Sequence, residues 1–266
     1  QLIRRFDTLG PRYTSYPTAD RFHAGFDVQS YNAQLEQRAA NTGSNPPLSV
    51  YVHIPFCESL CYFCACNKII TKEHGRAAEY LRYLAKEMAL VAARIGSDRQ
   101  TAQLHFGGGT PTFLSPDELR QLMQMLRSHF NFLPDAELGI EIDPRTVNDD
   151  TMVLLAELGF NRTSFGVQDF DPAVQQAVNR IQPLEMVEKA VTASRKAGFV
   201  SVNADLIYGL PKQSLESFDH TLDSIIALSP DRIALYNYAH LPSRFKAQRL
   251  IVDSDLPSAE ERLQIF

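Results

Sequence analysis

Short apolar segments rich in β-branched residues alternate along the chain with longer segments that carry apolar residues every three or four positions. The first kind predicts buried strands and the second predicts amphipathic helices. Ser115 before Pro116 and Asp171 before Pro172 are typical helix starts. We expect strands at residues 48–54, 103–106, 138–142, 162–167, 201–207 and 232–238, and helices at 77–94, 116–130, 149–158, 171–179, 184–197 and 214–228.

The order of these elements predicts an α/β fold with a parallel sheet. Parallel neighbours need a crossover connection, and a helix between successive strands supplies it. Periodicity alone leaves two architectures open, an open doubly wound sheet and a barrel. Residues 1–47 do not follow the alternation and contain several turn-forming prolines and glycines. We expect them to form an N-terminal arm packed on a main domain of residues 48–266.

Composition excludes several classes of protein. With 44% hydrophobic and 21% charged residues, the 266-residue chain is typical of a folded globular protein. A formal net charge of −5 argues against a general nucleic-acid binder. No apolar run approaches the ~18 residues of a membrane span, and the first ten residues are too charged for a secretory signal. We expect a cytoplasmic monomer.

All four cysteines, Cys57, Cys61, Cys64 and Cys66, follow the first predicted strand within ten residues. Thiols clustered in this way in a reducing compartment are typical of metal or redox sites. A zinc site normally pairs two CxxC units across a longer loop, whereas the C-x3-C-x2-C spacing suits three corners of an iron–sulfur cube. The role of Cys66 is not decided by the spacing: it can be a fourth ligand or a residue that faces the reaction chamber.

Polar and glycine residues follow the predicted strands at the ends that face the same edge of the sheet, where ligands bind in parallel α/β folds. The glycines at 107–109 allow close approach of a ligand to the backbone. Glu141 and Asp143 fall on one face and can accept hydrogen bonds from ribose hydroxyls. Arg180 can pair with a carboxylate, although a lone arginine is as often a solvated surface charge. His53, His105 and His240 can equally be structural residues or ligands.

The sequence Cys57-x3-Cys61-x-Phe63-Cys64 after a strand resembles the signature of the radical S-adenosylmethionine (SAM) enzymes. In that family three cysteines hold a [4Fe–4S] cluster, and the reduced cluster cleaves SAM to a 5′-deoxyadenosyl radical. The three glycines resemble the family's motif for the methionyl amino group, with Thr110 and a proline in place of its acidic residue. The resemblance implies a partial (β/α)6 TIM-like barrel of parallel strands, an N-terminal arm, and a C-terminal domain that this chain does not include.

Within the family, the segments at 11–19, 51–57, 141–144, 205–211 and 237–242 are similar to enzymes of haem synthesis. Those enzymes convert two propionate side chains of coproporphyrinogen III to vinyl groups without oxygen, giving protoporphyrinogen IX. The resemblance therefore implies this small-molecule substrate, a separate electron donor and a terminal electron acceptor. A haem-binding chaperone of the same family is the alternative, but its relatives typically have an aromatic residue where this chain has Cys66, and they lack the arm.

The resemblance also implies the roles of individual residues. The implied cluster ligands are Cys57, Cys61 and Cys64, and Cys66 is the implied catalytic residue. The implied contacts of two SAM molecules are Tyr51, Gly108 and Glu141 for the cluster-bound molecule, and Phe63, Gly109, Thr110, Gln168, Arg180, Asp205 and Ala239 for the second. Because the substrate is a tetra-anion, we expect the arm residues Arg4, Arg5, Arg12 and Arg21 to contribute to its binding.

Overall fold

The computed structural model describes residues 17–18, 21–41 and 43–266. In this part of the chain the main sheet has six strands, all parallel, in the order β1-β4-β5-β6-β7-β8. They span Leu48–Ile54 (β1), Gln100–Gly108 (β4), Asn131–Ile142 (β5), Arg162–Gln168 (β6), Ser201–Tyr208 (β7) and Arg232–Asn237 (β8). A short parallel pair, β2 (Phe56–Cys57) and β3 (Ile69–Ile70), stands apart. The expected parallel α/β sheet is confirmed.

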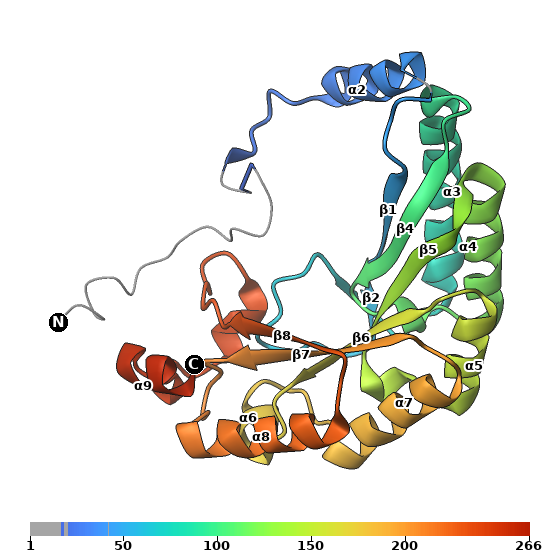
Figure 1. Cartoon of the computed structure of the whole chain (residues 1–266). Helices are drawn as coiled ribbons and strands as arrows, with labels where there is room; N and C mark the ends of the chain where they lie inside the picture. The colour runs from blue at the N-terminus through green and yellow to red at the C-terminus, as the bar shows by residue number, and fades with distance from the viewer. Residues whose placement is uncertain (1–16, 19–20, 42) are drawn as a thin grey trace.

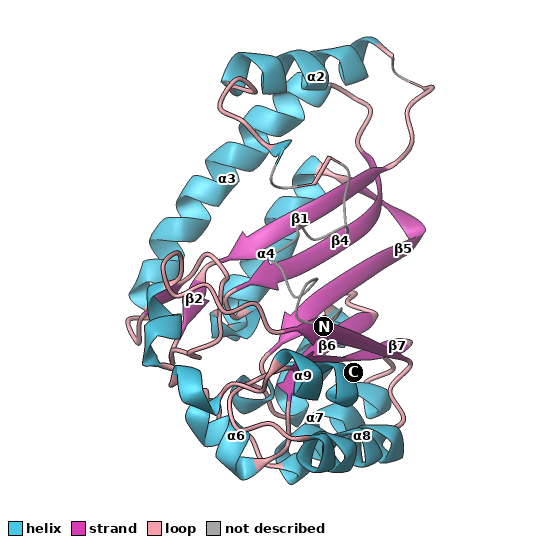
Figure 2. Ribbon diagram, turned by 90° about the vertical axis from the view of Figure 1, so that its left-hand side faces the viewer, coloured by secondary structure: helices cyan, strands magenta, loops and turns pink. Residues whose placement is uncertain are grey.

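The main sheet is strongly curved but open, with β1 and β8 as its two edges, so the fold is a partial barrel (Figure 1). The helices that connect successive strands of the main sheet cover its convex side (Figures 1 and 2). The helices span Val28–Ala40 (α2), Gly75–Ile95 (α3), Pro116–His129 (α4), Asp149–Glu157 (α5), Pro172–Ala177 (α6), Leu184–Lys196 (α7), Leu215–Leu228 (α8) and Ala259–Ile265 (α9). No described helix is long and apolar enough to cross a bilayer.

Alternation along the strands separates the core from the site. In β6, Phe165 and Val167 are buried in the core, whereas Ser164 and Gln168 line a cavity on the concave side. Successive side chains of a strand point to opposite faces, so one strand contributes to both layers. The concave side of this partial barrel is polar, unlike the packed apolar interior of a closed TIM barrel.

The structure adds helix α2 and the short strands β2 and β3 to the expected elements and lengthens β4 and β5. Helix α2 was not predicted, because it buries none of its residues and has no continuous apolar stripe. Its only described core contact from an aliphatic side chain is that of half-buried Leu35; in addition, Asp27 caps its first turn, and Arg38 Nη2 lies 3.5 Å from a carboxylate oxygen of Asp98. Strand β5 starts at Asn131, well before the expected 138, because its first residues pair with the start of β4. The predicted arm residues Arg4, Arg5 and Arg12 lie outside the described residues.

Candidate active site

The cysteine loop begins and ends on a small sheet at the carboxyl end of β1. Cys57 lies in β2 and pairs with Ile70 of β3, which closes the loop at its base. The backbone N–H of Tyr62 donates to the carbonyl of Val178 at 2.9 Å, which ties the middle of the loop to the end of α6. Asn179, next along the chain, donates from its side chain to the carbonyl of Leu60 at 2.8 Å. The loop is therefore anchored at its base and at its centre.

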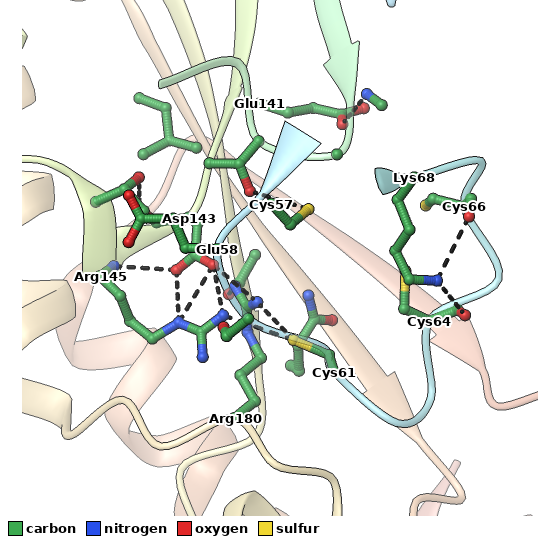
Figure 3. A pocket seen from close by; sticks show the side chains of 18 of the residues that line it. Cys57, Glu58, Cys61, Cys64, Cys66, Lys68, Glu141, Asp143, Arg145 and Arg180 are labelled. Atoms are coloured by element: carbon green, nitrogen blue, oxygen red, sulfur yellow. Dashed lines mark hydrogen bonds and ion pairs between the residues drawn. The ribbon is translucent and has the colours of Figure 1, made fainter. Parts of the chain in front are cut away.

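A cavity of about 420 Å³ lies between this loop and the carboxyl ends of the strands (Figure 3). The structure brings most of the expected site residues to it: Cys57, Cys61, Phe63, Cys64, Cys66, Gly108, Gly109, Thr110, Glu141, Gln168, Arg180 and Asp205 all line it. Tyr51 and Ala239 do not line it. Residues from one loop and from the ends of β4, β5, β6 and β7 thus share one chamber.

Hydrogen-bond donors approach the sulfur atoms of two cysteines (Figure 3). Thr110 Oγ1 donates to Cys57 Sγ at 3.5 Å. The guanidinium groups of Arg180 and Arg145 donate to Cys61 Sγ at 3.4 Å and 3.6 Å. Donors placed in this way stabilise thiolate charge.

Asp143 holds both arginines. Arg145 donates to its two carboxylate oxygens at 2.9 and 2.6 Å, and Arg180 donates to one of them at 3.2 Å. Burial acts to raise the pKa of Asp143, but the charge of Arg180 and the hydrogen bond from Arg145 outweigh it and lower this pKa. The expected pairing of Arg180 with a carboxylate is confirmed, whereas the Asp143 carboxylate is taken up by arginines and is not free for a ribose.

Cys64 and Cys66 interact with each other beside Lys68. A hydrogen bond from Cys66, assisted by the positive charge of Lys68, lowers the pKa of Cys64 to about 6. The same hydrogen bond and burial raise the pKa of Cys66. Lys68 Nζ also donates to the carbonyl oxygen of Cys64 at 3.0 Å (Figure 3). Cys64 therefore favours the thiolate, the form that binds metals.

The glycine loop after β4 fits against the start of the cysteine loop. A Cβ on Gly109 would lie 2.7 Å from the carbonyl oxygen of Phe56 and 2.8 Å from that of Pro55. Gly108 has a φ of +115°, and a Cβ there would lie 2.6 Å from the ring of His53. Only glycine allows this approach without displacement of neighbouring atoms. The glycine loop and the cysteine loop are consequently held at a fixed separation.

Glu141 contacts both the glycine loop and the side chain of His105. Its carboxylate accepts from the backbone N–H of Gly108 at 3.2 Å and lies 3.3 Å from His105 Nε2. The His105 ring is stacked on Tyr51, with centroids 6.0 Å apart, and the Tyr51 hydroxyl is 3.0 Å from His53 Nδ1. Both histidines, left open by the sequence, therefore contact expected site residues.

Strands β6 and β7 contribute two of the expected site residues, Gln168 and Asp205, to the wall of the cavity. Asp205 accepts from Ser164 Oγ at 2.8 Å and from Asn203 Nδ2 at 2.7 Å, while burial raises its pKa. The register between β6 and β7 shifts at Gly166, and Gln168 adopts a φ of 68°. Such irregularities at strand ends re-aim side chains and cluster at functional sites.

A buried polar network lies directly behind these strand ends. Asp169, which is 1% exposed, accepts from Gln213 Nε2 at 2.6 Å and from Thr221 Oγ1 at 3.2 Å. Burial raises the pKa of Asp169 to about 6. Gln213 Oε1 accepts in turn from the N–H of Gly209 at 2.5 Å. The network connects the end of β6 to the turn after β7.

Sequence reasoning missed Arg145 and Gln248. The amide nitrogen of Gln248 donates to the carbonyl oxygens of Phe63 at 3.0 Å and Ala239 at 3.1 Å, so it connects the cysteine loop to the segment after β8. No local motif marks either residue as part of the site, because the contacts that bring them to the cysteine loop, with Cys61 and Phe63, span 84 and 185 positions. His240 contacts Tyr238 and Asp253 and does not line the cavity.

Comparison with known proteins agrees with this geometry. The Radical SAM superfamily matches residues 51–225. The chain belongs to the radical SAM superfamily. The expected cysteine signature, glycine loop and partial barrel all lie within or around the matched segment. Membership implies a [4Fe–4S] cluster and SAM as cofactors.

The chain is also similar along its whole length to curated relatives. Oxygen-independent coproporphyrinogen III oxidase of Pseudomonas aeruginosa is 54% identical over 100% of the chain, and that of Escherichia coli K12 is 48% identical over 100% of it. The chain spans 57% of the length of each of these relatives. A solved structure of coproporphyrinogen III oxidase from Escherichia coli superposes with a TM-score of 0.89 at 49% identity, covering 95% of this chain and 57% of that one.

More distant structures share the fold alone. The archaeal Elp3 of Methanocaldococcus infernus superposes with a TM-score of 0.55 at 15% identity, over 82% of this chain and 52% of that one. The likeness shows that the curved parallel sheet is a framework common to proteins of different sequence.

The residues present fit an iron–sulfur cluster. Four cysteines from one loop line one cavity, three of them in the expected C-x3-C-x2-C spacing, and hydrogen-bond donors approach the sulfurs of Cys57 and Cys61. Soft thiolate ligands with such donors are the environment that Fe–S clusters require. Among the described residues, no three His, Cys, Asp or Glu side chains are grouped around a single ion position. The donor set and the cavity, and not a preformed ion geometry, therefore support the fit.

Proposed function

We propose that the chain is the catalytic barrel of an oxygen-independent coproporphyrinogen III oxidase of haem synthesis. The observation that carries the proposal is the cavity in which the cysteine loop faces Glu141, Gln168 and Asp205. The relatives that match all of the chain carry the name of this activity and support the choice of substrate. We place the enzyme in the cytoplasm as a monomer that receives electrons from a separate donor.

In this proposal Cys57, Cys61 and Cys64 hold a [4Fe–4S] cluster. When bound and reduced, the cluster supplies the electron that cleaves SAM to methionine and a 5′-deoxyadenosyl radical. We assign two SAM molecules to the site. The first contacts Tyr51, Gly108 and Glu141, and the second contacts Phe63, Gly109, Thr110, Gln168, Arg180, Asp205 and Ala239.

The protein's part in the reaction is to position groups and to exclude water. The N–H of Gly108 and the ring of His105 fix the Glu141 carboxylate, so that its remaining acceptor sites can bind ribose hydroxyls. Ser164 and Asn203 hold Asp205 in the same way on the opposite side. Acceptors held in advance lose little entropy when a ligand binds.

In each decarboxylation the substrate loses one hydrogen atom, one CO2 and one electron. A hydrogen atom leaves the β-carbon of a propionate and forms 5′-deoxyadenosine. The bond to the carboxylate then breaks, CO2 leaves, and one electron passes to a one-electron acceptor as the vinyl double bond forms. Two such rounds convert coproporphyrinogen III to protoporphyrinogen IX and consume two SAM molecules. We propose that Cys66, exposed at the cavity, acts on the substrate and not on the cluster.

The test is an anaerobic incubation of the reconstituted protein with SAM, a strong reductant, a one-electron acceptor and coproporphyrinogen III, followed by mass analysis. We expect successive losses of CO2 from the porphyrinogen together with 5′-deoxyadenosine. Asp205→Asn should raise the KM for SAM, whereas Asp117→Asn, whose side chain is 97% exposed on α4, should not. 5′-Deoxyadenosine with an unchanged porphyrinogen would contradict the substrate. Haem binding with neither product, from protein with an intact cluster, would favour the chaperone.

A further inference from the structure

Two arginines converge on the sulfur of Cys61, and one carboxylate holds them there. Arg145 holds Asp143 bidentately, with Nε donating to Oδ1 at 2.9 Å and Nη2 donating to Oδ2 at 2.6 Å. Arg180 donates to the same carboxylate at 3.2 Å and to the carbonyl of Gly166 at 2.6 Å. The nitrogens that meet Asp143 Oδ2, Arg145 Nη2 and Arg180 Nη1, also donate to Cys61 Sγ, at 3.6 and 3.4 Å (Figure 3).

This arrangement makes the three proposed ligands unequal. The sulfur of Cys57 accepts from the neutral hydroxyl of Thr110. Cys64 has one cation beside it, Lys68, whose Nζ donates to the Cys64 carbonyl at 3.0 Å. Cys61 alone of the three has two guanidinium groups among the contacts of the described residues. Hydrogen bonds from charged donors to a ligand sulfur are therefore concentrated at one corner of the proposed cluster.

The local charge and burial both favour a strong effect. Arg145, Arg180 and Asp143 together carry a net charge of +1, and their side chains are 19%, 8% and 10% exposed. Glu58, a further acidic residue of the cavity wall, is 3.2 Å from His74 and pairs with it. Charges removed from water interact more strongly than charges at the surface.

We propose that Arg145 and Arg180 raise the reduction potential of the cluster through their hydrogen bonds to the Cys61 sulfur. The proposal rests on the proposed function only in that Cys57, Cys61 and Cys64 hold a cluster. One-electron reduction makes the cluster more negative, so donors and positive charge at a ligand sulfur stabilise the reduced state more than the oxidised state. Asp143 is a positioning residue, because it acts through the two arginines.

The geometry also explains why arginine occupies position 145. A planar guanidinium has five N–H donors in a fixed fork, so Arg145 can hold the carboxylate through Nε and Nη2 and still direct the second N–H of Nη2 at Cys61 Sγ. Lysine has the same charge on a flexible stem and cannot make both contacts with fixed geometry. Substitution by lysine therefore separates the effect of charge from that of directed hydrogen bonds.

The test is a redox titration of the reconstituted holoprotein, followed by electron paramagnetic resonance of the reduced cluster, without porphyrinogen. For Arg145→Gln we expect an about tenfold lower ratio of reduced to oxidised cluster at a fixed applied potential, equivalent to a midpoint ~59 mV more negative. Arg145→Lys should show a smaller shift in the same direction. The matched control is Arg162→Gln, because the Arg162 side chain is also 19% exposed and also pairs with a carboxylate, that of Glu137.

Iron and sulfide content is measured for each variant, so that loss of the cluster is not mistaken for a shift in its potential. If Arg145→Gln does not retain iron, Arg145→Lys is the variant that decides. A midpoint equal to that of the wild type and of Arg162→Gln, in protein with full iron content, would overturn the proposal. Because the titration uses no porphyrinogen, this outcome is distinct from failure of the proposed oxidase activity.

Discussion

Replacement of Gly109 by alanine is expected to push the end of β4 away from the cysteine loop. The new Cβ would lie 2.7 Å from the Phe56 carbonyl oxygen and 2.8 Å from the carbonyl carbon and oxygen of Pro55. These are backbone atoms, so no change of rotamer relieves the contact. Ordinary van der Waals contact starts at 3.4 Å, and the two backbone segments must therefore separate by about 0.7 Å.

The expected loss in the free energy of unfolding depends on the hydrogen bonds that join the two segments. The N–H of Gly109 donates to the carbonyl of Ile54 at 2.7 Å, and the N–H of Thr110 donates to that of Phe56 at 2.8 Å. The separation weakens both bonds, each worth about 0.5–1.5 kcal/mol, and adds an overpacking cost of about 1–3 kcal/mol. We expect a loss of about 2–4 kcal/mol in the free energy of unfolding. Cys57 follows Phe56 directly, so cluster retention should fall as well.

Urea unfolding is monitored by circular dichroism, and iron content is measured after anaerobic reconstitution. Gly75→Ala is the matched control, because no atom lies within 4 Å of its expected Cβ and alanine is a better helix former in α3. That variant should keep wild-type iron content and equal or higher stability. Gly109→Ala with the stability and iron content of Gly75→Ala would refute the reasoning.

Three further results are expected. Gly107→Ala places a Cβ 2.8 Å from Glu141 Oε1, a movable side-chain atom, so it should raise the KM for SAM several-fold with little loss of stability. Burial raises the pKa of Asp169 to about 6 from an unfolded value of 3.8, so the folded chain binds more protons between these values and its stability falls as the pH rises. Asp169→Asn should remove this fall, which is ~3 kcal/mol between about pH 4 and pH 7. Cys66→Ser should keep iron content but impair turnover.

Each of these expectations has a clear contrary result. An unchanged KM for SAM in Gly107→Ala would separate Glu141 from SAM binding. Parallel pH profiles of unfolding free energy, measured by urea titration of wild type and Asp169→Asn, would show that the buried carboxyl does not titrate in this range. Loss of iron from Cys66→Ser would make that cysteine a cluster ligand.

The sequence predicts well those features that depend on local pattern. The strand and helix alternation is strong because each strand buries one face against helices, and the cysteine loop is recognisable because its cysteines are close in sequence. Helix α2 lacked such a signal, since it packs half-buried Leu35 against the core without a continuous apolar stripe and has polar contacts through Asp27 and the ion pair between Arg38 and Asp98. The early start of β5 depends on pairing with β4, which no local pattern encodes.

The second layer of the site was beyond the reach of sequence reasoning. Arg145 contacts Cys61 across 84 positions, and Gln248 contacts Phe63 across 185. An isolated arginine or glutamine is normally a surface residue, and only the fold shows that these two are directed at the cysteine loop. The sequence therefore marked the cysteines together with Thr110 and Arg180, which donate to their sulfurs, but not Arg145 or Gln248.

The most direct test of the proposed function follows the hydrogen atom. Coproporphyrinogen III deuterated at the propionate β-carbons is incubated anaerobically with the reconstituted protein, SAM, a reductant and an electron acceptor. The proposed function predicts one deuterium in each 5′-deoxyadenosine and a vinyl product formed in step with it. 5′-Deoxyadenosine without deuterium, while the porphyrinogen keeps all its propionates, would contradict it.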